Sequence, residues 1–172
     1  SRSDLTRRVE LNALSYDLPN AASLTGFHFV SQSSQLPNMF GVQLTFSLSW
    51  SGTFDRRYVF EFHALPSNLW NLGVVGSNCQ GYESMRLIPG SSCVLAFFPT
   101  QTFSRSVSHA NGFKILIGES NAVTSPSSFK LLVNTPPVGT NMPWMAITKR
   151  VNGYDKGKFC SSQVLSVPVV VQ

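Results

Sequence analysis

The stretch GVQLTFSLSWSG, residues 41–52, decides the fold class of this chain. Its apolar residues recur at every second position: Val42, Leu44, Phe46, Leu48 and Trp50. The residues between them are polar but uncharged: Gln43, Thr45, Ser47 and Ser49. Side chains alternate between the two faces of a strand, whereas a helix would scatter this pattern around its circumference. The stretch is therefore predicted to be a long strand with one face in a core. The other face is predicted to lie against a protein neighbour or chain arm.

Further segments of the chain show strand-like patterns with turn residues at their ends. Including the central stretch, strands are predicted at residues 25–31, 42–50, 57–63, 83–88, 92–98, 113–117, 129–133 and 144–149. A short connection separates the second of these from the third, which predicts a hairpin between them. The segment 164–171 is β-branched but holds Pro168, so it is predicted to be an extended edge or arm.

The spacing of these segments predicts the architecture. Short strands, long loops and the lack of an amphipathic segment long enough for a core helix indicate an antiparallel sandwich or barrel. Long loops favour a Greek-key arrangement over an up-and-down barrel. The predicted fold is an all-β, antiparallel, eight-stranded jelly-roll sandwich with extended N- and C-terminal arms. A length of 172 residues suits one domain. It is divided into an N-terminal arm (1–20), a jelly-roll core (21–138) and a last strand with a C-terminal arm (139–172).

The composition is poor in charge and rich in aromatic residues. Charged residues make up 12% of the chain, about half the usual share. Permanent interfaces shed charge and keep aromatic residues, so the composition favours a subunit of an assembly. The net charge is +5, and the basic residues lie mostly near the ends of the chain: Arg2, Arg7, Arg8, Lys149, Arg150, Lys156 and Lys158. One interpretation of this charge is that it only keeps the protein soluble. The more specific interpretation is weak contact with a polyanion such as RNA.

The cysteines indicate no disulfide framework. Cys79, Cys93 and Cys160 are odd in number and lack the close spacing of a metal or redox motif. A reducing compartment fits this pattern best. Residues 18–54 contain no charged side chain, but they are too rich in polar residues to span a membrane.

No catalytic motif stands out in the sequence. The carboxylates form no close pair for acid–base chemistry, and no glycine-rich phosphate loop is present. His28 and His63 lie among apolar residues, where a structural role is the common one. A cysteine hydrolase using Cys93 and His109 would need a pairing that no known signature supports. The chain is therefore predicted to be no enzyme and to use no cofactor, metal or small-molecule substrate.

A carbohydrate-binding, lectin-like module is the alternative. Trp50 or Trp70 would stack on a sugar, and the loop residues Asn68, Asn71 and Asn78 would bind its hydroxyl groups. A buried tryptophan at the end of a core strand is the more common arrangement. A secreted lectin would also be expected to show paired cysteines or a signal peptide.

Four stretches carry a resemblance to a known family. VQLTFSLSWSG (42–52) and YVFEF (58–62), followed by PGSSCVLAF (89–97) and FKLLVN (129–134), resemble the coat domains of picorna-like plant viruses, the secovirids. In comovirus and nepovirus coat domains similar strands recur in the same order, with a tryptophan beside the first. The resemblance covers roughly residues 40–138 and is one of pattern more than of identity.

The resemblance implies a structural function. The size is most similar to that of the cheravirus coat proteins, three separate small subunits cut from a polyprotein. Ser1 and Gln172 would then be processing-site residues, and the chain would be the middle subunit. The family implies a pseudo-T=3 icosahedral shell around single-stranded RNA, built with two other coat proteins. The expected location is the virion, and the host cytoplasm before assembly.

Two sets of residues follow as candidate contacts. The expected RNA-facing residues are Arg2, Arg7 and Arg8. The expected subunit contact is the uncharged face of the central strand: Gln43, Thr45, Ser47 and Ser49.

Overall fold

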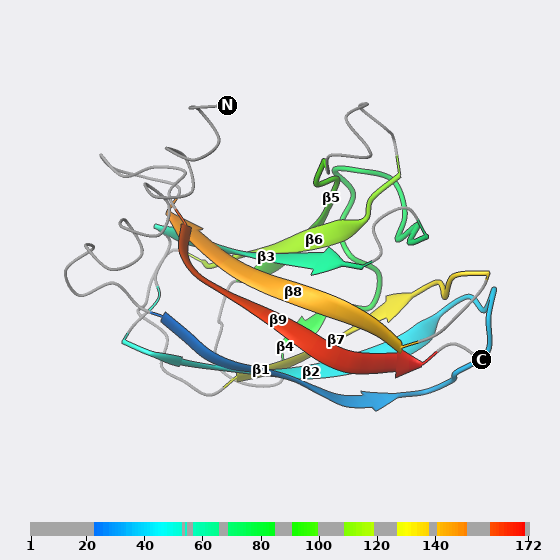
Figure 1. The fold of residues 1–172 in the computed structure, drawn as a ribbon. Helices are drawn as coiled ribbons and strands as arrows, with labels where there is room; N and C mark the ends of the chain where they lie inside the picture. The colour runs from blue at the N-terminus through cyan, green and yellow to red at the C-terminus, as the bar shows by residue number, and fades with distance from the viewer. Residues whose placement is uncertain are drawn as a thin grey trace, which may run out of the picture.

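A computed structural model describes residues 23–52, 54, 57–65, 69–84, 91–99, 109–118, 127–137, 141–150 and 159–170. These residues form strands and loops but no helix, as Figure 1 shows. The strands are β1 (Ser23–Gln32), β2 (Val42–Ser51), β3 (Tyr58–Ala64), β4 (Glu83–Ser84), β5 (Ser92–Ala96), β6 (Gly112–Leu116), β7 (Ser127–Val133), β8 (Asn141–Arg150) and β9 (Phe159–Val170). Nothing in the described part of the chain is a helix long and apolar enough to cross a membrane.

The strands form two antiparallel sheets that face one another (Figure 1). The four-stranded sheet has the order β1-β2-β7-β4, and the five-stranded sheet has the order β5-β6-β3-β8-β9. The all-β, antiparallel class predicted from the sequence is therefore confirmed. Each predicted strand from 25–31 to 144–149 overlaps a strand of the structure, although β4 is two residues long among the described residues.

The central strand β2 has the predicted two faces. Its apolar side chains are all buried, from Leu44 and Phe46 at 0% exposed to Trp50 at 5%. β2 lies between β1 and β7, so its backbone is paired along both edges. Val42 lies opposite Val133, and Leu48 lies opposite Ser127. Burying a large apolar side chain contributes roughly 1.5–3 kcal/mol, so this face helps to anchor the four-stranded sheet to the core.

The predicted hairpin between β2 and β3 is wrong. β2 pairs with β1 and β7, whereas β3 pairs with β6 and β8 in the other sheet. The short connection crosses from one sheet to the other because it carries its own core residue. Phe54 is fully buried, and its ring centroid lies 5.4 Å from that of Trp50 and 4.8 Å from that of Phe60. Connection length alone does not separate a hairpin from such a crossing.

The prediction that the cysteines form no disulfide is also wrong. Cys79 and Cys93 are bonded to each other, with their Cα atoms 5.3 Å apart. They meet because the loop before β4 runs antiparallel along β5, where Asn78 lies opposite Val94. The backbone N–H of Cys79 donates to the carbonyl oxygen of Cys93 at 2.9 Å. The expectation of a reducing compartment thereby loses the observation on which it rested.

The C-terminal part of the chain forms two long strands. β8 contains the predicted strand 144–149, and β9 pairs with it at the edge of the five-stranded sheet. Pro168 therefore lies in an edge strand, as its lack of an N–H requires. β1 and β9 run next to each other, so the edges of the two sheets meet on this side (Figure 1). The predicted N-terminal arm, residues 1–20, lies outside the described residues.

We predict that the Cys79–Cys93 disulfide stabilises the fold. Replacing both cysteines with serine should lower the free energy of unfolding by about 3 kcal/mol, since the bond closes a short loop in the unfolded chain. The separation of the two residues is 14 positions. Urea unfolding with and without a reductant measures the effect. Reductant should destabilise the unaltered chain and the Cys160→Ser control but not the double variant. If the unaltered chain, the Cys160→Ser control and the double variant were equally stable without reductant, the prediction would be contradicted.

Candidate functional site

A corner of the sandwich presents apolar side chains to solvent. It is formed by the 33–41 loop, which joins β1 to β2, and by the 134–137 segment, which follows β7. Leu36 is 54% exposed, Met39 39% and Phe40 83%. Exposed apolar groups that gather in one place on a soluble domain mark an interaction site more often than single ones do.

Buried Thr135 fixes the position of this loop. Its hydroxyl group donates to the carbonyl oxygen of Leu36 at 2.6 Å and accepts from the backbone N–H of Met39 at 2.9 Å. The backbone N–H of Thr135 donates to the carbonyl oxygen of Met39 at 2.9 Å. The backbone N–H of Asn38 donates to the carbonyl oxygen of Pro136 at 3.0 Å. The loop is therefore held by its backbone, and its apolar side chains remain free to make contacts.

The local sequence explains the sharp turn of the loop. Asn38 has a positive φ of 53°, a conformation that asparagine tolerates better than most residues. Pro37 precedes it, and proline–asparagine pairs favour turns. Gly41, with φ at 69°, then returns the chain to β2. Its backbone N–H donates to Oδ1 of Asn134 at 3.3 Å.

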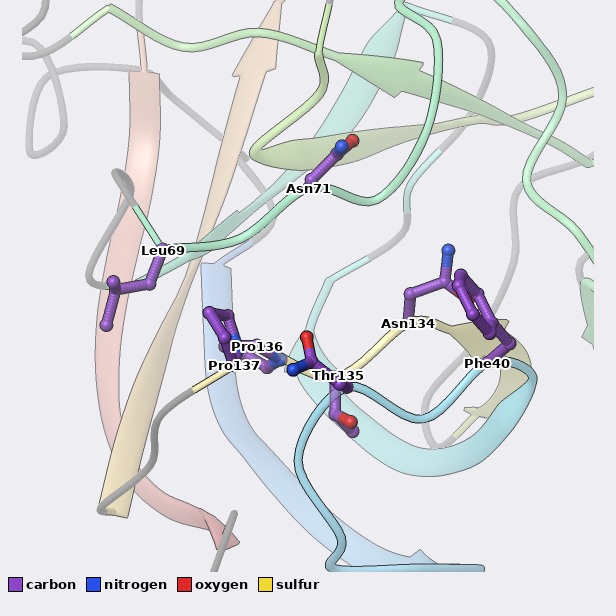
Figure 2. A pocket seen from close by; sticks show the side chains of 8 residues that line it. Phe40, Leu69, Asn71, Asn134, Thr135, Pro136 and Pro137 are labelled. Carbon is purple, nitrogen blue, oxygen red and sulfur yellow. The ribbon is translucent and has the colours of Figure 1, made fainter.

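A pocket of about 420 Å³ lies beside this loop. Figure 2 shows Phe40 and Asn134 at one end of the pocket and Leu69 at the other. Its lining includes the side chains of Phe40, Leu69, Asn71, Asn134, Pro136 and Pro137. No charged side chain is among the described residues that line it. The pocket therefore suits a neutral ligand.

The two asparagines of the pocket are oriented by backbone hydrogen bonds. Oδ1 of Asn71 accepts from the N–H of Gly73 at 3.2 Å, and Oδ1 of Asn134 accepts from the N–H of Gly41. One of the two lone pairs of each Oδ1 atom is thereby used, which orients the amide. The Nδ2 group of each, with two N–H donors, remains to bind a ligand.

The predicted subunit-contact residues lie in one row on the outer face of the four-stranded sheet. Gln43 is exposed, whereas Thr45, Ser47 and Ser49 are half-buried. The neighbouring strands add charge to this face, because Lys130 of β7 lies opposite Thr45. Lys130 also pairs with Glu83 of β4 at 3.2 Å. The row itself is uncharged, but the surface around it is not.

The tryptophans assigned to a lectin site are core residues. Trp50 is 5% exposed and Trp70 3%, and Nε1 of Trp70 donates to the carbonyl oxygen of Leu65 at 3.1 Å. Neither ring can stack on a sugar. Asn71 and Asn78 are exposed, and of these Asn71 lines the pocket.

The cysteine hydrolase alternative is wrong because Cys93 is in a disulfide and has no thiol. His109 pairs through its backbone with Val74 and lies in an exposed position. Asn68, Ser1, Gln172 and the arginines expected to face RNA (Arg2, Arg7 and Arg8) lie outside the described residues.

A buried carboxylate on the outer face of the five-stranded sheet forms a second cluster. Oε1 of Glu61 lies 3.2 Å from Nε2 of His63 and 3.2 Å from Nζ of Lys149. Burial alone would raise the pKa of Glu61, but the hydrogen bond from His63 and the charge of Lys149 outweigh it and lower the pKa below its ordinary value. The Glu61 carboxylate is thus held in its charged form.

Phe98 covers this cluster. Its ring stacks on that of His63 with the centroids 3.8 Å apart. The side chain of Asn111 holds Phe98 in place, accepting from its N–H at 2.8 Å and donating to its carbonyl oxygen at 2.9 Å. His63 therefore has the structural role that the sequence suggests. His28 does not, since it is exposed on β1. Within the described ranges, no three potential metal ligands come together.

The sequence patterns did not single out Phe40 or Asn134. A weak signal was present: Phe40 falls in step with the apolar positions of β2, but the apolar Met39 beside it does not, and both directly follow a Pro37–Asn38 turn. Two adjacent apolar residues in a turn do not belong to a strand face. Asn134 carries no such signal, because its proximity to Gly41 arises only from the pairing of β2 with β7.

Comparisons with known proteins leave the family open. Neither models of protein families nor curated proteins give a match. Among solved structures, the chain is similar to the crystal structure of BslA, described as a bacterial hydrophobin. The two share 9% sequence identity and a TM-score of 0.41, over 84% of this chain and 96% of that one. A similarity at this level carries no argument about function.

We predict that Thr135→Val loosens the corner. The change removes the acceptor of the Met39 N–H and should lower the free energy of unfolding by about 1–3 kcal/mol. Hydrogen exchange of the Met39 amide should accelerate with it. Thr135→Ser keeps the hydroxyl group and serves as the control. Equal urea stability and equal Met39 exchange in the valine and serine variants would refute the role of this hydroxyl.

We also predict an acid-sensitive contribution from Glu61. Because the folded state lowers the pKa of Glu61, its contribution is full above the pKa of the unfolded chain and is lost as the pH falls through the folded value. Glu61→Gln should therefore reduce the free energy of unfolding at neutral pH. It should also make the free energy of unfolding change less as the pH falls into the acid range. Lys149→Met should flatten the dependence in part. Urea unfolding across this pH range tests both, and unchanged slopes would exclude the effect.

Proposed function

We propose that this chain is a structural subunit of the coat of an icosahedral RNA virus. It assembles with two other coat proteins around single-stranded RNA and has no enzymatic activity. The order of the central strands supports the proposal most, because it is the order of a jelly roll. That order adds to the resemblance of residues 40–138 to secovirid coat domains.

The jelly roll is argued from the strand pairing. In a jelly roll the second strand pairs with the seventh, which pairs with the fourth, and the third lies between the sixth and the eighth. Here β7 lies between β2 and β4, and β3 lies between β6 and β8. These pairings join strands far apart in sequence and are hard to reach with simple hairpins.

Two strands depart from that arrangement. A jelly roll pairs its first strand with the eighth and its fifth with the fourth, whereas β1 pairs with β2 and β5 with β6. β9 occupies the flank of β8 that a first strand would take, and β1 runs beside β9. We interpret the fold as a jelly-roll variant in which β9 takes the place beside β8 and β1 joins the opposite sheet.

A second exposed apolar patch suits assembly. Val74 is 64% exposed and Val75 39%, on the loop that the disulfide ties to β5. Charge-poor contacts of modest size become strong together when a closed shell repeats them. We assign this Val74–Val75 patch to subunit contacts, together with the predicted row from Gln43 to Ser49.

The remaining features agree with a coat subunit in a virion that forms in the host cytoplasm. Disulfides persist on virion surfaces, so the Cys79–Cys93 bond is compatible with that location. The charges of Glu61 and Lys149 balance each other, and His63 packs against Phe98, which leaves this cluster a structural role. Contact with RNA is assigned to Arg2, Arg7 and Arg8 and is expected to be weak.

The proposal predicts that the chain sediments with RNA. In particles pelleted from the source tissue, antibody against the chain should detect it together with nuclease-protected RNA. The expressed full-length chain should form oligomers or aggregates in analytical ultracentrifugation. Replacing Val74 and Val75 with aspartate should shift it toward the monomer.

A matched control separates lost apolar contact from added charge. Asn78 and Gln80 are exposed on the same loop, and their replacement with aspartate adds the same charge without removing an apolar side chain. This control should keep the oligomers. A soluble monomer from the unaltered chain, absent from pelleted particles, would overturn the coat function.

A further inference from the structure

We propose that the pocket beside Phe40 binds a short, neutral carbohydrate. The site lies at the corner formed by the 33–41 loop and the 134–137 segment. It differs from the positions that the sequence suggested for a lectin, since Trp50 and Trp70 are buried. The proposal goes beyond the coat function and does not depend on it.

Phe40 supplies an exposed aromatic face. Its side chain is 83% exposed and still lines the pocket. The face of an aromatic ring is negative, and the C–H groups of a pyranose are weakly positive, so the two surfaces attract. The backbone N–H groups of Met39 and Gly41 donate to the side chains of Thr135 and Asn134, which holds the backbone on both sides of Phe40. The backbone that carries the ring is therefore in place before a ligand arrives, which reduces the entropy lost on binding.

Asn71 and Asn134 supply hydrogen-bond donors from two separate segments. The Oδ1 atom of each accepts a backbone N–H, from Gly73 and Gly41 respectively. The Nδ2 groups have no bond to another of the described residues that would compete with a ligand. Fixed amide donors beside an aromatic face suit sugar hydroxyl groups, each of which offers lone pairs as an acceptor.

The lining disfavours anions and nucleic acids. No lysine, arginine or histidine is among the described residues that form it. Grooves that bind single-stranded RNA combine stacking rings with positive charge, and the charge is missing here. Sulfated and sialylated sugars would likewise find no cation among the described lining residues.

The lining also disfavours an added peptide strand. Pro136 and Pro137 have no N–H, and the N–H of Thr135 already donates to Met39. A peptide that extends a sheet needs free backbone donors and acceptors along the edge that it joins. The volume of about 420 Å³ is at the small end of ligand pockets, which span roughly 300–1,000 Å³. One or two sugar units would fill it.

A glycan array tests the proposal with the full-length protein. The array carries neutral mono- to tetrasaccharides, each with its sialylated and sulfated counterparts. We expect binding to a subset of the neutral sugars, confirmed by titration with the free sugar in solution. Phe40→Ala should weaken binding at least about tenfold, as loss of a central aromatic contact does. Asn71→Asp and Asn134→Asp keep the Oδ1 acceptor but remove the donor, and each should weaken binding.

Leu36→Ala is the matched control. Leu36 is exposed on the same loop but does not line the pocket, so its loss should leave the sugar affinity unchanged. Binding that is equal in the Phe40 and Leu36 variants would overturn the proposal. So would binding of only charged sugars, binding of RNA that requires Phe40, or no neutral sugar bound above background. The aspartate variants at Val74 and Val75 should bind sugar normally even where they fail to assemble, which separates this test from that of the coat function.

Discussion

The contact of the Phe46 ring with both sheets is the constraint on which this structure depends. Its centroid lies 5.2 Å from that of Phe27 on β1, 5.5 Å from Phe129 on β7 and 5.3 Å from Trp144 on β8. All four side chains are 0% exposed. A slip of one residue in β2 would exchange Phe46 for Ser47 and place a hydroxyl group among the three remaining rings. The register of β2 against both neighbours is therefore set by a single aromatic cluster.

That register also creates the pocket. With Phe46 opposite Phe129, Val42 at the start of β2 lies opposite Val133 at the end of β7. The 33–41 loop and the 134–137 segment then leave the sheet at the same end. This brings Thr135 to Met39 and Asn134 to Gly41, although each pair is more than ninety positions apart in sequence. The exposure of Phe40 thus follows from the core, because the bonds that fix its backbone exist only in this register.

Alternation along single strands was predictable from the sequence, and pairing between strands was not. The buried face of β2 follows from its period of two, and so do the positions of β1, β3 and β7. The prediction of a hairpin between β2 and β3 was wrong because Phe54 of the connection is buried in the core, which the length of the connection does not reveal. The disulfide between Cys79 and Cys93 could not be predicted from their spacing, because their proximity depends on a loop that runs along β5. The pocket was missed for the same reason, since its donors come from segments that meet only in three dimensions.

The covered edges restrict how the proposed coat subunit can associate. The loop before β4 bonds along the outer edge of β5, where the N–H of Gly76 donates to Leu95 at 2.9 Å and that of Leu95 to Ser77 at 2.8 Å. On the opposite side β9 runs next to β1. Open strand edges promote uncontrolled pairing with other chains, and these two are not available for it. Association then relies on side chains on loops and outer faces, or on the outer edge of β4. Contacts between side chains fix both the partner and the angle at which two subunits meet. A closed shell depends on these two properties more than on the strength of each contact.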